Sequence, residues 1–523
     1  MGAIGRASWA LTFLWFSAQA HPKKAALGAG LILPLAFAPF FLLPIFYIAY
    51  GVFLGLWARA DNLKAVLGLG WWFGFGQFFV GLIWMGEAFL VEAEHFLWLL
   101  PAAITLLPAG LAVFPAVAAG LAFLGRRHFG LTRVPAALLM CLSVALAAYL
   151  RSTILTGLPW NLPAMGWASW LYLAQPVAFI GVHGLSLMAL ISAALLPLAG
   201  RARLLAILLP LVAGCLSWVQ LHGRDTPPAT DTTLIVMQPN IAQRDKWQPE
   251  QRQAHIEKTL RLTRMAVAQA PDVDLVIWPE TALPALIDEG PGFGERLRAL
   301  YPANIVRRPY LLTGAIRREV GVSRSAFFNS ALLWSGEGDL LARSDKHHLV
   351  PFGEYLPMQD WLEALGLEQL TRLRGGYSAG QAHARLSAAG LPDMGLLICY
   401  EAIFPSLSGG APRPDVLINI TNDGWFGHSI GPHQHIALAR LRAIEQGLPF
   451  VRSANTGISA GFDARGRLLQ KLALGEAGSL TIRLPGALPP TPYARYGDAL
   501  FFGLCFFVLG VIGLRNRLRV SRG

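Results

Sequence analysis

Charged residues are scarce in this chain. Of its 523 residues only 14% are Asp, Glu, Lys or Arg, whereas 54% are hydrophobic, and the mean hydropathy is +0.47. A composition this apolar excludes an ordinary soluble protein, and the chain is too long for one domain. The apolar residues are concentrated before about residue 222 and again after about residue 490. We therefore expect a multi-span α-helical membrane bundle in 1–222, an α/β soluble domain in 223–490, and a C-terminal membrane helix with a basic tail in 491–523.

Cysteine is also rare, with four in the whole chain. Cys141, Cys215 and Cys505 fall in apolar stretches, so Cys399 is the only cysteine of the expected soluble domain. This distribution excludes a disulfide framework, and no CxxC pair has the spacing of a zinc site. A solitary thiol without a partner in its own domain fits a working thiol.

The membrane-spanning stretches can be counted from their length. Seven apolar stretches precede the soluble domain and an eighth follows it, each near the roughly 20 residues that cross a bilayer. The apolar run at 7–20 is short, and because another apolar stretch follows at once, we expect an interfacial helix there rather than a cleaved signal peptide. A further span is the alternative. The eight expected spans lie at approximately 23–41, 42–58, 64–86, 95–123, 133–151, 170–197, 203–221 and 498–514.

The orientation of these spans follows from the basic residues of the short loops. In this arrangement they all fall on one side, which is therefore cytoplasmic, and the soluble domain lies on the opposite, extracytoplasmic face. This topology accounts for much of the formal net charge of +12. No basic stripe marks the soluble part, so we expect no nucleic-acid partner. The loop residues are Lys23, Lys24, Arg59, Lys64, Arg126, Arg127, Arg133, Arg201, Arg203, Arg515, Arg517, Arg519 and Arg522.

The soluble part alternates two kinds of pattern. Short apolar runs are typical of buried strands, and longer stretches have helical periodicity. This alternation predicts an α/β domain. The expected strands lie at 233–238, 274–278, 310–316, 331–334, 395–398, 416–421 and 450–454, and the expected helices at 248–270 and 431–446.

Three stretches of this domain carry chemically active groups. In the first stretch Glu280 follows an apolar run, and in the third Cys399 follows another. The second stretch contains Lys346. A thiol, a carboxylate base and a cation are the groups that covalent acyl transfer requires. Taken singly, each has an ordinary structural explanation, such as a buried cysteine or a solvated lysine. The stretches read DLVIWPETALP (274–284), DKHHLVPFGEYLP (345–357) and MGLLICYEAIFP (394–405).

The order of the three motifs is specific. WPE, then KxxLVPFGE, then CYE resembles the Glu-Lys-Cys pattern of the nitrilase superfamily. With a membrane-embedded N-terminal half, the chain resembles the membrane-embedded branch of that superfamily, the apolipoprotein N-acyltransferases, along essentially its whole length. The resemblance implies a four-layer αββα sandwich for the soluble domain, which spacing alone does not predict.

The chemistry assigns a role to each motif residue. A free thiol is mostly protonated at neutral pH, so a base must take its proton before it attacks a carbonyl carbon. We assign Cys399 as the nucleophile and Glu280 as the general base and later general acid. Lys346 is expected to stabilise the tetrahedral oxyanion.

The resemblance also implies five supporting residues. Glu354 is expected to position the catalytic groups, and Tyr400 and Glu401 directly follow the nucleophile. Trp247 and Trp425 match aromatic residues near the acyl-binding region. Ordinary packing is the alternative explanation for Tyr400 and for both tryptophans.

The function that the resemblance implies is acyl transfer at the bacterial inner membrane, without a cofactor. Cys399 takes an acyl chain from a phospholipid, and the thioester passes it to the α-amino group of the N-terminal diacylglyceryl-cysteine of an apolipoprotein. A membrane-tethered amidase or nitrilase acting on a soluble amide is the alternative, although it would not need so many spans. A transporter or lipid-binding scaffold is disfavoured because Glu280, Lys346 and Cys399 are all present.

Two other patterns could mislead. GYSAG (376–380) and GHSIG (427–431) fit the nucleophile elbow of serine hydrolases, which must lie between a strand and a helix. GYSAG follows no apolar run, and GHSIG follows a loop. We therefore expect that neither Ser378 nor Ser429 is a nucleophile. His433 and His435 lack a third ligand at sensible spacing, so we expect no metal.

Overall fold

The chain forms two compact units in the computed structural model. The first comprises Met1–Ile83, Leu99–Gln220 and Tyr496–Gly523, and the second Trp84–Trp98 and Leu221–Arg495. The expected interfacial helix at 7–20 lies, except for its last residue, outside the described part of the chain. The structure describes residues 20–222, 227–286, 292–301, 305, 307–320, 325–364, 366, 369–371, 376–381 and 385–520.

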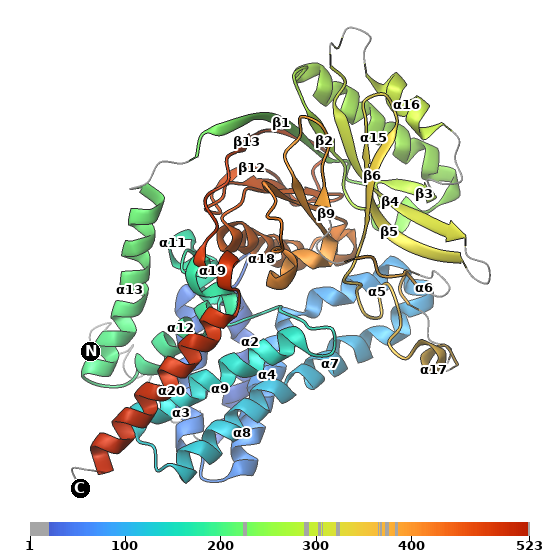
Figure 1. Ribbon diagram of the computed structural model, residues 1–523. Helices are drawn as coiled ribbons and strands as arrows, with labels where there is room; N and C mark the ends of the chain where they lie inside the picture. The colour runs from blue at the N-terminus through green and yellow to red at the C-terminus, as the bar shows by residue number, and fades with distance from the viewer. Residues whose placement is uncertain are drawn as a thin grey trace, which may run out of the picture. The chain divides into compact units, whose positions relative to one another are not determined.

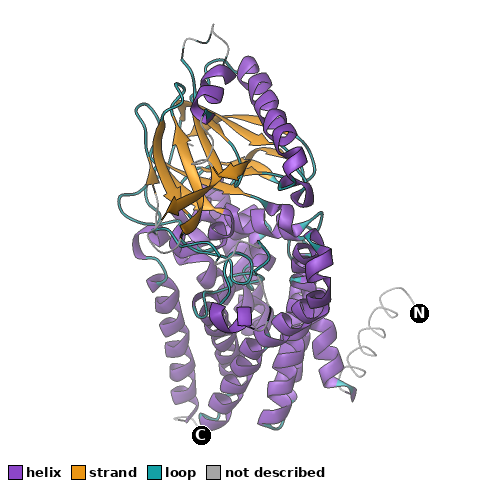
Figure 2. Ribbon diagram, turned by 90° about the vertical axis from the view of Figure 1, so that its right-hand side faces the viewer, coloured by secondary structure: helices purple, strands orange, loops and turns teal. Residues whose placement is uncertain are grey.

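The first unit is helical (Figures 1 and 2). Among the described residues, six apolar helices are long enough to cross a bilayer: Leu63–Gly81, Ala93–His128, Arg133–Thr153, Val177–Leu195, Arg201–His222 and Ala499–Arg517. The helices of this unit are α2 (Pro22–Ile32), α3 (Leu43–Arg59), α4 (Leu63–Gly81), α7 (Leu100–Leu111), α8 (Val113–His128), α9 (Arg133–Thr153), α10 (Met165–Ala168), α11 (Leu171–Ala174), α12 (Val177–Leu195), α13 (Arg201–His222) and α20 (Ala499–Val520).

The first expected span differs from the structure. Instead of one helix over 23–41, the chain forms α2, of 11 residues, followed by a short 3-10 helix at Leu33–Ala36. Pro34 and Pro39 lie in this stretch, and proline lacks the N–H group that continues an α-helix. Residues 25–41 contain no charged residue, so the length of the run favoured a single span although both prolines are visible in the sequence. The count of seven spans before the soluble domain stays a prediction.

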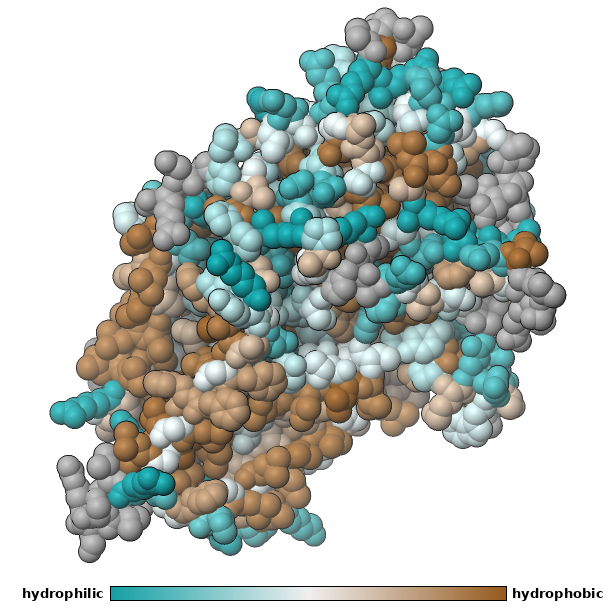
Figure 3. Space-filling view, viewed as in Figure 1, coloured by the Kyte–Doolittle hydropathy of each residue, from teal (hydrophilic) through white to brown (hydrophobic). Residues whose placement is uncertain are grey.

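Close helix packing in the first unit depends on glycine. A Cβ atom added to Gly30 of α2 would lie 2.1 Å from the main-chain oxygen of Phe73 in α4, and one added to Gly70 of α4 would lie 2.6 Å from the Cα of Ala116 in α8. Small residues let helix backbones approach in this way inside a membrane. The outer faces of the helices are apolar, as the brown surface over them in Figure 3 shows. On α13, for example, Leu216 is 66% exposed.

The second unit is built on two β-sheets. The first sheet has the order β13 (Gly478–Pro485), β1 (Ala229–Gln238), β2 (Leu275–Ile277), β4 (Tyr310–Val320), β5 (Ser325–Trp334) and β6 (Leu340–Asp345), with β3 (Leu283–Leu286) paired to β4. The second has the order β12 (Leu468–Leu472), β11 (Ser459–Phe462), β10 (Phe450–Ala454), β9 (Val416–Thr421), β8 (Met394–Ile398) and β7 (Arg385–Leu386).

The two sheets form the inner layers of a sandwich. Buried side chains of both sheets, such as Val236, Leu312 and Ile418, make up one core cluster between them. The outer face of the first sheet packs on α15 (Pro249–Gln269) and α16 (Phe293–Leu300), and that of the second on α18 (Gly431–Gln446). The expected αββα arrangement is confirmed. The other helices are α5 (Glu87–Val91), α6 (Ala93–Phe96), α14 (Gln243–Lys246), α17 (Gln359–Ala364) and α19 (Pro492–Tyr496).

The central strands of both sheets run parallel. In the first sheet β1, β2 and β4 are parallel neighbours, and in the second β8, β9 and β10 are. Parallel strands end at the same edge of a sheet, where functional side chains collect. Glu280 follows β2 and Cys399 follows β8, so each sheet delivers one of these residues just beyond the end of a central strand.

Candidate active site

Cys399 stands at a strained turn directly after β8. All five residues of β8 are buried, and a short 3-10 helix begins at Cys399 itself. The backbone of Cys399 has a φ of 53°, in the left-handed region that residues with a Cβ rarely adopt. Such strain costs on the order of 1–3 kcal/mol and is often found where a side chain must be held in one direction. The side chain is buried, with 7% exposed.

Glu280 presents one unpaired carboxylate oxygen. The Asn329 side chain donates a hydrogen bond to its Oε1, with 2.6 Å between nitrogen and oxygen. Its Oε2 is buried and has no hydrogen-bond partner among the described residues. A buried carboxylate oxygen without a donor is an uncommon and costly arrangement, and it leaves Oε2 able to accept a proton.

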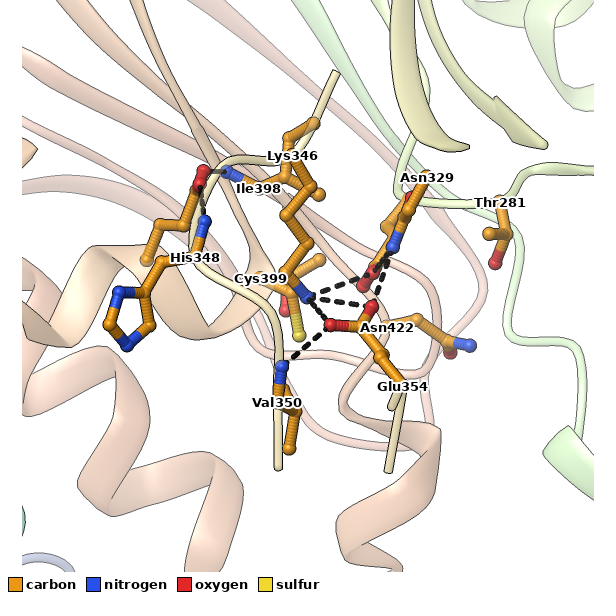
Figure 4. Close-up of polar contacts among 12 residues, drawn as sticks. Thr281, Asn329, Lys346, His348, Val350, Glu354, Ile398, Cys399 and Asn422 are labelled. Carbon is orange, nitrogen blue, oxygen red and sulfur yellow. Dashed lines mark hydrogen bonds and ion pairs between the residues drawn. The ribbon is translucent and has the colours of Figure 1, made fainter. Parts of the chain in front are cut away.

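Lys346 follows β6 and is a buried cation, with 1% exposed. Its ammonium nitrogen lies 2.9 Å from each carboxylate oxygen of Glu354 and 3.8 Å from Oε1 of Glu280. Burial alone would lower the pKa of Lys346, but the charges of Glu354, Cys399 and Glu280 outweigh burial and raise it above the usual range. The ammonium is therefore charged at every physiological pH. Figure 4 shows the Cys399 sulfur and the Glu354 carboxylate both next to this nitrogen.

The pKa of the Cys399 thiol lies above its ordinary value. Burial raises the pKa of the thiol, the Glu280 carboxylate raises it further, and Lys346 opposes both without cancelling them. A thiol of this kind needs a base to become a nucleophile. The three residues assigned from the sequence are thus brought into one buried electrostatic cluster, with the groups that covalent acyl transfer needs.

Glu354 and Glu401 are fully engaged carboxylates. Glu354 accepts hydrogen bonds from Lys346, from Asn329 at 3.0 Å and from the main-chain N–H of Val350 at 2.8 Å. Every carboxylate oxygen of Glu354 and Glu401 accepts at least one hydrogen bond. We therefore expect both residues to hold neighbouring groups in place rather than to accept a proton from the thiol. The main-chain donors to Glu401 are Ile398 at 2.7 Å, His347 at 2.8 Å and His348 at 3.0 Å.

Those donors make Glu401 a clamp between two segments. One of its oxygens binds the end of β8, which carries Cys399, and the other binds the two residues that follow Lys346. Burial raises the pKa of Glu401, although these N–H groups and Lys346 act in the opposite direction. The clamp fixes the lysine segment against the nucleophile.

The aromatic residues expected at the site lie in different settings. The Tyr400 ring packs on Phe404, with 5.0 Å between ring centroids, and on His348 at 5.8 Å. Trp247 directly follows α14 and is 39% exposed. Trp425 is partly buried in the 3-10 helix Asp423–Phe426, which follows β9. A role of any of them in binding an acyl chain stays a prediction.

A buried charged network behind Cys399 was not predicted from the sequence. Asp423, His435 and Arg452 are each 0% exposed, and Asp423 binds His435 at 2.9 Å and Arg452 at 2.5 Å. Burial alone would raise the pKa of Asp423, but Arg452 and His435 lower it below its usual value. Asn419 of β9 donates to the main-chain oxygen of Cys399 at 3.4 Å. The one available signal was Asn419, a polar residue inside an apolar strand.

Asn329 was also missed. It lies on β5 and joins Glu280 to Glu354 through its single amide nitrogen. The neighbouring sequence, AFFNSALLW, contains no motif, and the pairing of β5 with β4 decides where the side chain points. Sequence reasoning could have flagged only a polar residue in a strand-like run.

The serine patterns do not form nucleophile elbows. Ser429 donates a hydrogen bond to the Phe426 main-chain oxygen at 2.6 Å and accepts one from the Gly431 N–H at 3.1 Å, so it shapes the start of α18. The main-chain N–H of Ser378 donates a hydrogen bond to the main-chain oxygen of Phe327 at 2.7 Å. No helix begins within GYSAG. Within the described ranges no three His, Cys, Asp or Glu side chains gather as metal ligands.

Comparisons with known proteins match both units. The model of the carbon-nitrogen hydrolase family matches residues 236–488. The model of the apolipoprotein N-acyltransferase N-terminal domain matches residues 29–195.

Relatives cover nearly the whole chain. An apolipoprotein N-acyltransferase of Rhodopseudomonas palustris is 38% identical over 99% of this chain and 98% of its own length. One of Bradyrhizobium diazoefficiens is 39% identical over 90% of this chain and 91% of its own length. Among solved structures, an amidase from Nesterenkonia sp. matches 54% of this chain and 98% of its own, at 18% identity and a TM-score of 0.36.

Proposed function

Because this chain belongs to the apolipoprotein N-acyltransferase family, we propose that it transfers an acyl chain from a membrane phospholipid to an apolipoprotein. The acceptor is the α-amino group of the N-terminal diacylglyceryl-cysteine. It is an acyltransferase of bacterial membranes with a nitrilase-type domain. The observation that carries the finer proposal is the cluster of a buried thiol, a carboxylate with one unpaired oxygen, and a permanently charged lysine.

The first half of the reaction forms a thioester. Oε2 of Glu280 takes the proton of the Cys399 thiol as the sulfur attacks the ester carbonyl carbon of the phospholipid. The negative charge moves to the carbonyl oxygen, where Lys346 stabilises it. The ester C–O bond then breaks, and the departing alcohol oxygen of the lysophospholipid takes the proton from Glu280.

The second half uses the same groups in reverse. The neutral α-amino group of the apolipoprotein attacks the thioester carbonyl, and Glu280 takes a proton from the nitrogen. The C–S bond breaks, an amide forms, and the proton passes from Glu280 to the Cys399 sulfur. Both halves are covalent catalysis by one nucleophile, and no cofactor takes part.

The location of the reaction belongs to the proposal. The basic loops favour an inner-membrane protein with its catalytic domain on the periplasmic side. A cysteine introduced at Gln251, a half-buried residue in the first turn of α15, should react with a membrane-impermeant maleimide in cells whose outer membrane alone is opened. Reaction only after the inner membrane is opened would place the domain in the cytoplasm.

The acyl-enzyme is the species to measure. Purified protein should be mixed with a phospholipid that carries an isotopically labelled acyl chain, and its intact mass followed. We expect a mass increase of one acyl group that neutral hydroxylamine removes, and none in Cys399→Ala. Absence of the adduct, together with ammonia release from small amides, would instead identify an amidase.

A further inference from the structure

The centre contains a second buried lysine. Lys246 is the last residue of α14 and is 1% exposed. Its ammonium nitrogen donates to the Thr281 hydroxyl at 2.7 Å and to the main-chain oxygen of Glu280 at 3.3 Å. Both partners are uncharged oxygens, in contrast to the carboxylate that binds Lys346. A lysine is seldom fully buried unless it is paired with an opposite charge, so its position calls for an explanation.

The Lys246 contacts fall on the turn that carries the base. Thr281 has a φ of 46°, in the left-handed region, so the backbone directly after Glu280 is strained. The ammonium group binds the main chain on one side of this turn and the side chain on the other. Lys246 therefore holds the segment from which the Glu280 carboxylate projects.

Lys246 also interacts with the reacting groups through its charge. Burial lowers the pKa of Lys246 to about 7, and the charges of Glu280 and Cys399 are the forces that oppose this decrease. The lysine thus senses the negative charge on the base and on the nucleophile. Lys346 differs, because the Glu354 ion pair keeps it charged throughout.

A count of charges shows what Lys246 can supply. Lys346 and Glu354 form a neutral pair. During acylation one further negative charge remains in the site: first on Glu280, then on the Cys399 sulfur, then on the carbonyl oxygen of the substrate. A buried charge without a counter-ion is strongly disfavoured, and the neutral pair leaves this migrating charge unmatched.

We propose that Lys246 is a positioning residue of the acyl-transfer centre, which holds the Glu280 turn and supplies the counter-charge for the negative charge that moves from Glu280 to Cys399 to the oxyanion. The inference rests on the proposed function, because it concerns the same thiol and base. The lysine makes no bond to the substrate and acts through Glu280. Lys246 thereby supports catalysis indirectly, although no sequence motif marks it.

The test is the pH dependence of Cys399 alkylation by iodoacetamide, followed by mass spectrometry of the peptide that contains Cys399. Alkylation needs no lipid, so it tests Lys246 separately from the thioester assay of the proposed function. The charge of Lys246 is present below a pH of about 7 and is lost above it. In Lys246→Met the alkylation rate at about pH 6 should therefore fall about tenfold or more relative to the wild type, whereas at about pH 9 the two rates should agree. Lys246→Arg, which keeps the charge, should retain the wild-type rate at about pH 6.

Two further variants make the result decisive. Lys258→Met is the matched control, because Lys258 also donates to a main-chain oxygen, that of Asn240 at 2.9 Å, and is partly buried. Its alkylation rate should match that of the wild type at both pH values. Lys246→Gln keeps a donor for Thr281 without the charge, and it is measured in place of Lys246→Met if that variant does not fold. A rate that falls equally at about pH 6 and about pH 9 would make Lys246 a structural residue and overturn the proposal. So would an unchanged profile.

Discussion

Glu280→Gln is the substitution that tests the assignment of the base most directly. Glutamine has nearly the same shape as glutamate, and its Oε1 can still accept the hydrogen bond from Asn329. The amide nitrogen then takes the place of Oε2, the oxygen that has no hydrogen-bond partner. The substitution therefore removes a proton acceptor and leaves the local packing in place.

The expected loss follows from the size of general-base catalysis. A positioned base contributes roughly 10²–10⁴-fold to a rate, which corresponds to about 3–5 kcal/mol of barrier. Because burial by itself raises the pKa of the Cys399 thiol, little thiolate forms without the base. We expect thioester formation in Glu280→Gln to fall by at least about a hundredfold.

Glu354→Gln is the matched control, since it replaces the other carboxylate that Asn329 binds. It breaks the buried ion pair with Lys346, and breaking such a pair by removing one partner typically costs about 3–5 kcal/mol of folding stability. The two variants should thus fail differently: Glu280→Gln stays folded and does not acylate, whereas Glu354→Gln loses stability.

The assay is single-turnover thioester formation, stopped by acid and measured by intact mass, with the folded fraction determined by thermal unfolding in detergent. Acylation by Glu280→Gln within about tenfold of the wild type would refute the reasoning, because the contribution of the base would then lie below its usual range. The proton acceptor would in that case have to be another group.

Three further predictions address the nucleophile, the cation and the network behind them. Cys399→Ser should abolish acyl transfer while Ser429→Ala retains it, as measured by the transfer of a labelled acyl chain from phospholipid to a lipopeptide. The opposite pattern would identify Ser429 as the nucleophile. Lys346→Met should slow acylation about a hundred- to a thousandfold, the usual cost of one oxyanion donor, with lipid binding by equilibrium dialysis little changed. Burial would raise the pKa of Asp423, but Arg452 and His435 lower it, so this carboxylate contributes stability that is present above its usual value of 3.8 and is lost as the pH falls through its lower folded value. Asp423→Asn should therefore be less stable than the wild type at neutral pH, and the difference should shrink in acid, as shown by unfolding curves at several pH values.

The sequence predicted the elements that deliver the site better than the contacts within it. The run at 395–398 matches β8, and that at 416–421 coincides with β9, because a short apolar stretch between polar turns is a local pattern. Cys399 and Glu280 were found for the same reason, since each follows such a strand.

What could not be predicted depends on residues that are distant in the chain. Asn329 reaches Glu280 only because β5 pairs with β4, which lies beside β2. Asp423, His435 and Arg452 come from three different elements, a 3-10 helix, α18 and β10. No local sequence pattern predicts that such residues form a buried ion pair. Lys246 follows Asp245 in a short polar stretch that carries no strand or helix pattern of its own, so the sequence does not indicate that it is buried. Strand register places Asn329, whereas the packing of helices α14 and α18 against the strand ends places Lys246 and His435.

The burial of Cys399 has a chemical consequence in the periplasm, where we place it. Oxidation and alkylation of cysteine proceed through the thiolate and need access to it. The Cys399 side chain is 7% exposed, and burial together with Glu280 raises its pKa, so the reactive form is rare until a base takes the proton. Glu280 can do so with its unpaired oxygen, and Lys346 opposes the pKa increase of the thiol through its charge. In the proposed mechanism the nucleophile is thus activated during attack on a carbonyl carbon rather than before it, which would protect a solitary thiol from oxidation in the proposed location.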